Sequence, residues 1–319
     1  MRFSVIIPLF NKAPYVRKAI ESVLNQSLQD FELIVVDDGS TDDSAEIAKK
    51  CLTGHSNALL LHQENSGVSV ARNNGVTASH THYLCFLDAD DWWEPTFLEE
   101  VDRLIEDFPD AGIYGANYTI VNETKHKTRI APIGLPNGFE RGYINYFQAY
   151  SKHLGMPLHS SCICIPKNVF TNFGGFPSDI TLGEDFILWV HIALKHKVAF
   201  VNKPLSNYNQ DIPIALRAVG HLHPPSRHML WNLHDLEEQE KVNEDLKTLL
   251  DQLRIYDLMP YFLSKQYHKE AVQELLKVNW DAQPKSRRKE FKAPMSYLRL
   301  RYRVLKLGAF FKTSIKNLI

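Results

Sequence analysis

The sequence has little cysteine, no long apolar run and almost no net charge, and each shortage excludes a class of protein. Four cysteines in 319 residues argue against a disulfide-stabilised scaffold and favour a reducing compartment. No apolar run reaches about 18 residues, so no transmembrane helix is predicted. The N-terminal apolar run is broken at Pro8 and Asn11 and is too short for a signal peptide. The formal net charge of −1 gives no global indication of nucleic-acid binding, and no nucleic-acid partner is expected. The reducing compartment that the cysteines favour is consistent with a cytoplasmic location.

Charge is nevertheless unevenly placed along the chain. Residues 285–319 contain 11 Lys or Arg and one acidic residue, Glu290. Apolar side chains alternate with these cations, and residues 294–316 could form a basic amphipathic helix. Such a helix can lie on an anionic membrane surface. It could equally pack on the body of the protein with a solvated charged face, and the sequence leaves both alternatives open.

Strand and helix patterns alternate through the first 110 residues. Short, largely apolar segments predict strands at Phe3–Phe10, Phe31–Asp38, Ala58–His62 and His82–Leu87, the second of which ends in two carboxylates. The segments between and after them predict helices at residues 11–26, 42–51, 66–78 and 95–108. This alternation predicts a doubly wound, Rossmann-like α/β fold with a mostly parallel twisted sheet and flanking helices.

Beyond residue 110 the pattern is less regular. Strands are predicted at residues 111–122, 161–165, 198–201 and 205–208. Helices are predicted at residues 142–152, 184–194, 226–259 and 260–278, and a long surface loop at 123–137. We therefore predict an α/β domain over residues 1–222 and a helical C-terminal region with a basic tail over residues 223–319.

Polar side chains follow the predicted strands of the N-terminal part. In a doubly wound sheet, ligands bind outside the carboxyl ends of the strands. The candidates at these ends are Asn11, Asp37, Asp38, Glu64, Asn65, Asp88, Asp90 and Asp91. No glycine-rich dinucleotide motif or P-loop follows any of these strands, which disfavours a dinucleotide fold or a P-loop kinase.

The segment Tyr83–Pro95, YLCFLDADDWWEP, is the most informative of these strand ends. An apolar run stops abruptly at Asp88, Asp90 and Asp91. Crowded carboxylates repel one another unless a positive charge lies among them. A hard divalent cation is the natural counter-charge. The alternative is a polar turn that caps the next helix.

Five segments of the sequence resemble glycosyltransferase family 2, whose members have the GT-A nucleotide-sugar transferase fold. They occur in the family's order and extend over roughly the first 200 residues, whereas the chain past about residue 225 matches nothing we can place. The segments are Ser4–Lys12, Phe31–Ser44, Asn65–Gly75, Phe86–Pro95 and Gly183–Val190.

The resemblance implies a nucleotide-sugar site at the strand ends. Phe10 would offer an aromatic face to the base, and Asp38 would accept from an imide N–H such as that of uracil. Gly67 would permit close backbone approach, and Arg72 would reach the base or the diphosphate. The residues implied for donor binding are Pro8, Phe10, Asn11, Asp38, Gly67, Arg72, Asp88 and Ala89.

The resemblance also implies a metal site, because Asp88-Ala89-Asp90 matches the family's DxD motif. Asp90 would ligate Mg²⁺ or Mn²⁺, with Asp88 and Asp91 as further candidates. The ion would bridge the two phosphates of the donor. His221 or His223 could complete the site, although the segment before them departs from the family pattern. Trp92 and Trp93 would border the sugar pocket or pack beneath the next helix.

Glu184-Asp185 matches the family's ED motif. Asp185 would be the general base that takes the proton of the acceptor hydroxyl, with Glu184 beside it. The family implies inversion at the anomeric carbon by a single displacement. The alternative is a pair of acids that favour a helix N-terminus through the helix dipole. Trp189, one turn later, is expected to pack in the core.

These features predict an inverting, metal-dependent glycosyltransferase that moves one sugar from a nucleotide donor, with UDP favoured. The family analogy places it in bacterial surface polysaccharide synthesis, acting on a glycan or lipid-linked acceptor at the inner face of the cell membrane. The QxxRW signature of processive synthases is absent. Two alternatives remain open, a nucleotidyltransferase and a non-catalytic scaffold. The first normally needs a glycine-rich basic loop, which the segment after the first strand lacks.

Overall fold

The computed structural model describes residues 1–213 and 220–304. The chain forms two compact units, residues 1–249 and 250–319, which divide within helix α9 (Glu244–Asp257). We predicted that the α/β transferase domain ends at residue 222, and this boundary stays a prediction.

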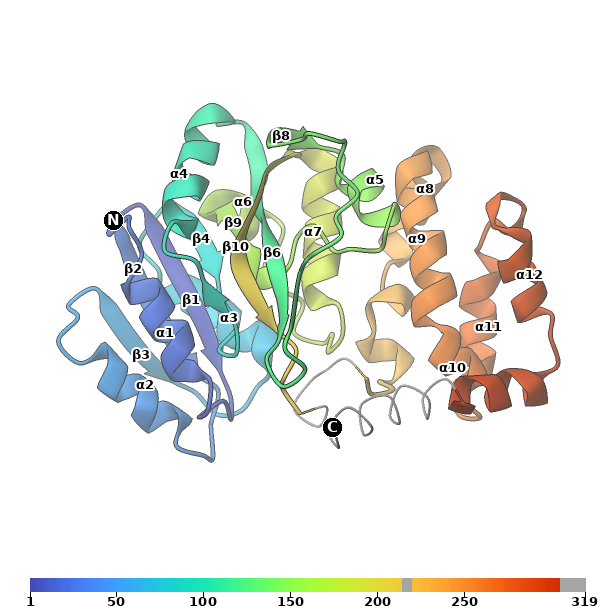
Figure 1. Cartoon of the computed structure of the whole chain (residues 1–319), viewed down its shortest axis with the longest axis horizontal. Coiled ribbons are helices and arrows are strands. Elements are labelled where there is room, and N and C mark those ends of the chain that lie inside the picture. Colours follow the sequence, from blue (N-terminus) through green and yellow to red (C-terminus); the bar gives the residue numbers. More distant parts are fainter. Residues whose placement is uncertain (214–219, 305–319) are drawn as a thin grey trace. The chain divides into compact units, whose positions relative to one another are not determined.

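One half of the sheet of the first unit consists of parallel strands in the order β3-β2-β1-β4 (Figure 1). Their bounds are β1 (Phe3–Leu9), β2 (Phe31–Asp37), β3 (Ala58–His62) and β4 (Tyr83–Phe86). The two central strands are mostly apolar because helices cover both of their faces. This part confirms the predicted strand and helix alternation.

Helices flank both faces of these strands. Alternate β1 residues, Phe3, Val5, Ile7 and Leu9, share one core with α1 (Val16–Leu24), α2 (Ser44–Leu52) and α4 (Phe97–Asp107). Helix α3 (Val68–Ala78) covers the other face. It approaches so closely that a Cβ on Gly75 would lie 2.5 Å from Cγ2 of Ile6. The glycine therefore sets the distance between α3 and the sheet.

The other half of the sheet is mixed. Strand β9 (Ile163–Pro166) runs antiparallel between β4 and β6 (Ala111–Asn122), and β10 (Lys197–Asn209) runs parallel to β6. Short antiparallel strands extend this half, namely β5 (Trp92–Trp93), β7 (Lys127–Ile130) and β8 (Arg141–Ile144). Because β9 is antiparallel to β4, the chain enters β9 where β4 ends.

Several predicted elements of this half need correction. The predicted loop at 123–137 contains β7, which pairs with β6. The predicted helix at 142–152 starts as β8 and is helical from α5 (Tyr146–Ser151). The two short strands predicted near residue 200 are one strand, β10, whose register shifts around Val201 and Pro204 absorb the proline. Helix α6 (Lys167–Asn172) was not predicted.

Helix α7 (Glu184–Lys195) matches its prediction, whereas the helix predicted at 226–259 does not. That segment contains three 3₁₀ turns, η3 (Pro225–Arg227), η4 (Met229–Trp231) and η5 (His234–Leu236), followed by α8 (Glu237–Val242) and α9. Another 3₁₀ turn, η1 (Ser160–Cys162), precedes β9.

The second unit is helical, as predicted. The helix expected at 260–278 is two helices, α10 (Met259–Leu263) and α11 (His268–Leu276). The turn η6 (Trp280–Ala282), helix α12 (Lys285–Phe291) and a helical segment at 295–304 follow. The end of the predicted basic amphipathic helix, beyond residue 304, lies outside the described residues. None of the helices in the described ranges combines the length and the apolar character that crossing a bilayer requires.

Candidate active site

The turn after β4 presents its three carboxylates to different partners. The backbone N–H of Asp91 donates to the carbonyl oxygen of Asp88 at 3.0 Å and closes this turn. Asp91 is 1% exposed, whereas Asp88 and Asp90 are partly exposed. The three acids that were adjacent in the sequence therefore have separate environments, and their roles can differ.

Asp91 lies deepest and is held by the mixed half of the sheet. Its Oδ2 accepts from the Ser161 hydroxyl at 2.6 Å, and its Oδ1 accepts from the Asn209 backbone N–H at 2.9 Å. Burial, together with the charges of Asp90 and Asp88, raises the pKa of Asp91 well above its ordinary value. Without a nearby cation the ionised form is therefore disfavoured.

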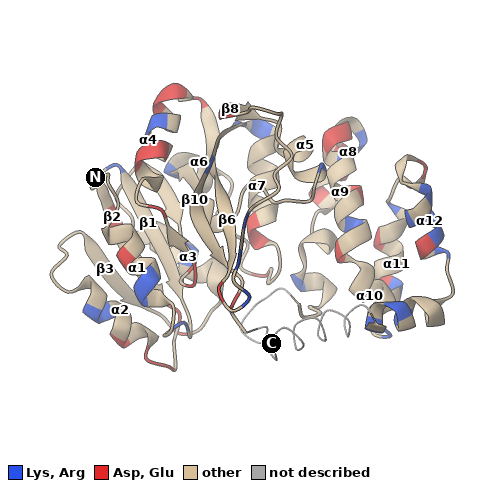
Figure 2. Cartoon of the chain, viewed as in Figure 1, with Lys and Arg blue, Asp and Glu red and all other residues tan. Residues whose placement is uncertain are grey.

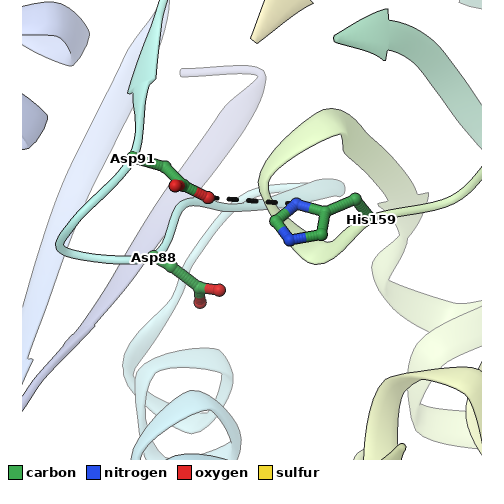
Figure 3. A group of neighbouring side chains, drawn as sticks. All are labelled: Asp88, Asp91 and His159. Carbon is green, nitrogen blue, oxygen red and sulfur yellow. Dashed lines mark ion pairs between the residues drawn. The ribbon is translucent and has the colours of Figure 1, made fainter. Parts of the chain in front are cut away.

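His159, at the start of η1, lies beside these acids. Its Nδ1 is 3.9 Å from Oδ2 of Asp91, and Asp88, Asp91 and His159 offer ligand atoms within 4.8 Å of one another (Figure 3). Burial lowers the pKa of His159, which keeps the imidazole neutral. Nδ1 also accepts from the backbone N–H of Ser161 at 3.2 Å. Two carboxylates and a neutral imidazole are a donor set suited to Mn²⁺ or Mg²⁺.

Asp90 takes a different partner. Nζ of Lys12 lies 2.5 Å from its Oδ2. In the described part of the chain, the group of potential metal ligands contains neither Asp90 nor His221 nor His223. The predicted metal contact of Asp90 therefore stays a prediction.

Arg72 joins the two acidic motifs. This α3 side chain is 3% exposed, and its Nη2 donates to Asp88 at 2.6 Å while its Nη1 donates to Glu184 at 2.9 Å. The guanidinium carbon lies 5.0 Å from the centroid of the Phe176 ring. Burial acts to raise the pKa of Asp88, but the guanidinium outweighs it and the pKa is lowered. Arg72 therefore ties the end of β4 to the start of α7.

Glu184 and Asp185 begin α7 after a braced turn. Gly183 adopts a φ of +83°, and a Cβ at this position would clash with Met229. Backbone hydrogen bonds hold this turn against η4, from Thr181 N–H to the Arg227 carbonyl and from Met229 N–H to the Leu182 carbonyl, both at 2.9 Å. The segment beyond residue 222 thus supports the ED motif.

The two acids of the ED motif differ in environment. Burial raises the pKa of Glu184 to about 7. The charge of the adjacent Asp185 adds to this rise, whereas the charge of Arg72 opposes it. Asp185 is half-buried, and its Oδ2 accepts from the Ser160 hydroxyl at 3.1 Å. Its Oδ1 accepts from the Phe186 backbone N–H at 2.7 Å. None of the ion pairs among the described residues includes Asp185, so these two hydrogen bonds orient its carboxylate.

The predicted donor-binding residues border the same end of the parallel strands. Asp38 accepts from the backbone N–H groups of Ser66 at 2.7 Å and Gly67 at 2.9 Å, so it orders the loop that enters α3. Asn11, with a φ of +50°, accepts from the Thr41 N–H at 2.8 Å. Phe10 is 43% exposed at the end of β1. Pro8 and Ala89 are buried nearby in β1 and the turn after β4. The contacts of these residues with a donor stay predictions.

The tryptophans divide between packing and surface. Trp93 stacks on Phe97 with ring centroids 4.0 Å apart, and its Nε1 donates to the Ser161 carbonyl at 2.7 Å. Trp92 is half-buried, with Nζ of Lys18 3.1 Å from its ring centroid. Trp189 is fully buried, as expected. Trp93 therefore packs, in agreement with one of the two sequence alternatives.

Sequence reasoning missed the contribution of the mixed half. It did not identify His159, Ser160, Ser161 or Asn209 as residues around the acids. It also missed Lys12, which follows β1 in the parallel half. A signal existed in the polar triplet HSS directly before the apolar run CICIP. Because β9 runs antiparallel to β4, the residues just before β9 lie at the end of β4, and knowledge of this pairing would have pointed to the triplet as part of the site.

Comparisons with known proteins show the family and the fold of the chain. The profile of Glycosyl transferase family 2 matches residues 4–173. Glycosyltransferase GlyA of Streptococcus pneumoniae is 37% identical over 124 residues, covering 39% of this chain and 18% of GlyA. The minor teichoic acid biosynthesis protein GgaA of Bacillus subtilis is 32% identical over 208 residues, covering 61% of this chain and 44% of GgaA. The chain thus spans less than half the length of these relatives.

Among solved structures, TarS 1-349 of S. aureus in complex with UDP-GlcNAc superposes with a TM-score of 0.68 at 19% identity. The match covers 94% of this chain and 88% of that chain. It shows that the chain has the GT-A fold. Because the family profile extends over more than half of the residues, the chain belongs to glycosyltransferase family 2.

Proposed function

We propose that the chain is an inverting, metal-dependent glycosyltransferase. It transfers one sugar from a nucleotide-diphosphate sugar, with UDP favoured, to a glycan or lipid-linked acceptor. The observation that carries the proposal is the convergence of Asp88, Asp91 and His159 beside the Arg72–Glu184 pair and Asp185. This constellation combines a site for a cation with a separate carboxylate that can accept a proton.

The acidic turn fits a divalent cation. Opposite ligands of Mg²⁺ or Mn²⁺ are about 4 Å apart, and the three candidate ligand atoms lie within 4.8 Å of one another. Burial, and then the charges of Asp90 and Asp88, raises the pKa of Asp91, and a cation among these carboxylates would oppose that rise. Asp88, Asp91 and His159 would hold the cation, with Asp90 as a further candidate. When bound, it would neutralise charge on the two phosphates of the departing nucleoside diphosphate.

The proton transfer belongs to Asp185. Its Oδ2 would take the proton of the acceptor hydroxyl as that oxygen attacks the anomeric carbon from the face opposite the phosphate. Ser160 and the Phe186 N–H orient this carboxylate. The hydrogen bonds of Arg72 to Glu184 and Asp88 fix the start of α7 relative to the acidic turn. They would therefore keep the Asp185 carboxylate at a constant distance from the bound donor.

The relatives support a sugar nucleotide and a bacterial surface polymer. The solved TarS structure contains UDP-GlcNAc, and GgaA is named for minor teichoic acid biosynthesis. Phe10 and Asp38 lie where they would meet a base at the carboxyl ends of β1 and β2. A lipid-linked acceptor would place the enzyme in the cytoplasm at the inner face of the cell membrane, and peripheral membrane contact belongs to the same proposal.

The proposal is tested by donor hydrolysis and transfer assays with Mn²⁺ or Mg²⁺ across a panel of nucleotide sugars. We expect turnover with a UDP-sugar, abolished by a chelator and restored by the ion. The stereochemistry of the product at the anomeric carbon reports inversion. Nucleotide binding without turnover on any donor would support the scaffold alternative. Absence of both turnover and metal-dependent nucleotide binding would refute the proposal.

A further inference from the structure

The helical segment at 295–304 has apolar side chains on two opposite faces. Leu298 is 3% exposed and packs inward, and Nε of Arg299 donates to the Leu263 carbonyl at 3.0 Å, which anchors the helix within the second unit. Tyr297, Leu300 and Val304 are 54%, 62% and 57% exposed. They are spaced three and four positions apart, so they line one helical face, which we call the outer stripe.

Cations border the outer stripe. Arg301 and Arg303 lie on its two sides, and both are exposed. Arg301 also reaches Glu290 at 2.8 Å, a surface pair of the kind that contributes little stability. Residues 285–304 contain eight Lys or Arg and one acidic residue. Figure 2 shows basic residues gathered on α12 and on the helix that follows it.

We propose that the outer stripe docks on an anionic membrane surface. An apolar face flanked by arginines suits the boundary between headgroups and acyl chains, where tyrosine is also favoured and arginine can reach the phosphates. A neutral protein surface would satisfy the apolar stripe but not the cations. The strong local excess of positive charge therefore selects a negatively charged lipid surface. This inference does not depend on the donor or the metal of the proposed reaction.

Vesicle co-sedimentation of the full chain tests this surface. The probes are phosphatidylcholine vesicles with and without phosphatidylglycerol, and the variant is Tyr297→Ser/Leu300→Ser/Val304→Ser, which keeps every charge. We expect the parent to bind the anionic vesicles and the triple variant to bind at least about tenfold more weakly. Val242→Ser removes a 78% exposed apolar side chain from the acidic helix α8 and should bind like the parent.

The cations are tested with Arg301→Gln/Arg303→Gln, which should weaken binding to anionic vesicles by roughly tenfold. High salt should have a similar effect on the parent. Equal binding of the parent and the triple variant, or no binding by the parent, would overturn the proposal. A parent dimer that the triple variant loses, with no vesicle binding, would instead make the outer stripe an interface between two copies. Circular dichroism checks that the variants fold.

Discussion

The two halves of the sheet contribute to the site in different ways. In the parallel half, the acids of the site follow strands closely, as Asp38 follows β2 and Asp88 follows β4, and Arg72 lies on the helix α3 that covers them. In the mixed half, the residues arrive by way of pairings between distant segments, as His159 does through β9 and Asn209 through β10. A local sequence pattern therefore reveals the site acids of the parallel half. The site residues of the mixed half reach these acids only because strands that are distant in the sequence pair in the sheet.

If the parallel half binds the nucleotide and Asp185 accepts the proton, the largest loss of transfer is expected on substitution of Asp185. Asp185→Asn should lower transfer about 10²- to 10⁴-fold because the amide cannot accept the acceptor's proton. Binding of UDP, which the parallel half would hold, should remain at the parental level. The measurements are initial rates and nucleotide titrations. Asp179→Asn, at an exposed position in the preceding loop, serves as the control. Unchanged transfer in Asp185→Asn would show that this residue is not the base.

Arg72 sharpens the comparison because it links the two halves. Arg72→Met leaves the buried Glu184 and the partly exposed Asp88 without their cation, and we expect the free energy of unfolding to fall by roughly 3 kcal/mol, the lower end of the range for buried pairs. Glu184→Gln in the same chain should recover part of this loss. Urea unfolding provides the measurement. Lys50→Met, which removes the exposed pair with Glu46, should cost less than about 1 kcal/mol. Parental stability of Arg72→Met would mean that the link does not matter for folding.

His159 tests whether the mixed half contributes to metal binding. His159→Ala should weaken Mn²⁺ binding at least about tenfold, since losing even an outer-shell partner typically costs that much. Calorimetric titration in the presence of UDP gives the affinity. The exposed His153→Ala is the matched control. If both variants bind Mn²⁺ like the parent, the acids of the parallel half suffice.

His228 gives the smallest predicted effect and concerns the brace behind the ED motif. Burial, aided by His223, lowers its pKa from 6.5 to about 4. The unfolded chain therefore binds the proton more readily, and stability falls as the pH drops from 6.5 towards 4. Between pH 7 and 5, we expect this residue to contribute about 1–2 kcal/mol of that loss.

Comparing the pH dependence of unfolding in the parent and in His228→Gln checks this expectation. The variant should lose that part of the slope, whereas His153→Gln should retain it. An identical slope in the parent and in His228→Gln would show that His228 titrates alike in the folded and unfolded chain.

Much of the parallel half could be predicted because its information is local. Mostly apolar runs such as Phe31–Val36 specify buried strands, and acids follow these runs at the predicted site edge. The helix that begins at Glu184 could likewise be predicted from its pattern, whereas the role of its acids was implied by the resemblance. The resemblance implied donor contact for Arg72, and the structure adds its bonds to Asp88 and Glu184.

The mixed half could not be predicted to the same extent because long-range pairing decides it. β8 is strand because it pairs with β10, although its sequence resembles the start of the helix that follows. Two short strands were predicted at residues 198–201 and 205–208, but register shifts around Pro204 make them one strand, β10. The approach of His159 to Asp91 joins residues far apart in the chain, as does the Lys12–Asp90 pair of the parallel half. No periodicity within one segment reports such contacts.

The central claim is that both halves of the sheet hold one metal ion. Pulsed electron paramagnetic resonance of the Mn²⁺-loaded protein with UDP tests it most directly, because a histidine nitrogen bound to Mn²⁺ gives a measurable hyperfine coupling. We predict this coupling in the parent and in His153→Ala, and its loss in His159→Ala. Absence of the coupling in the parent, or its persistence in His159→Ala, would contradict the account.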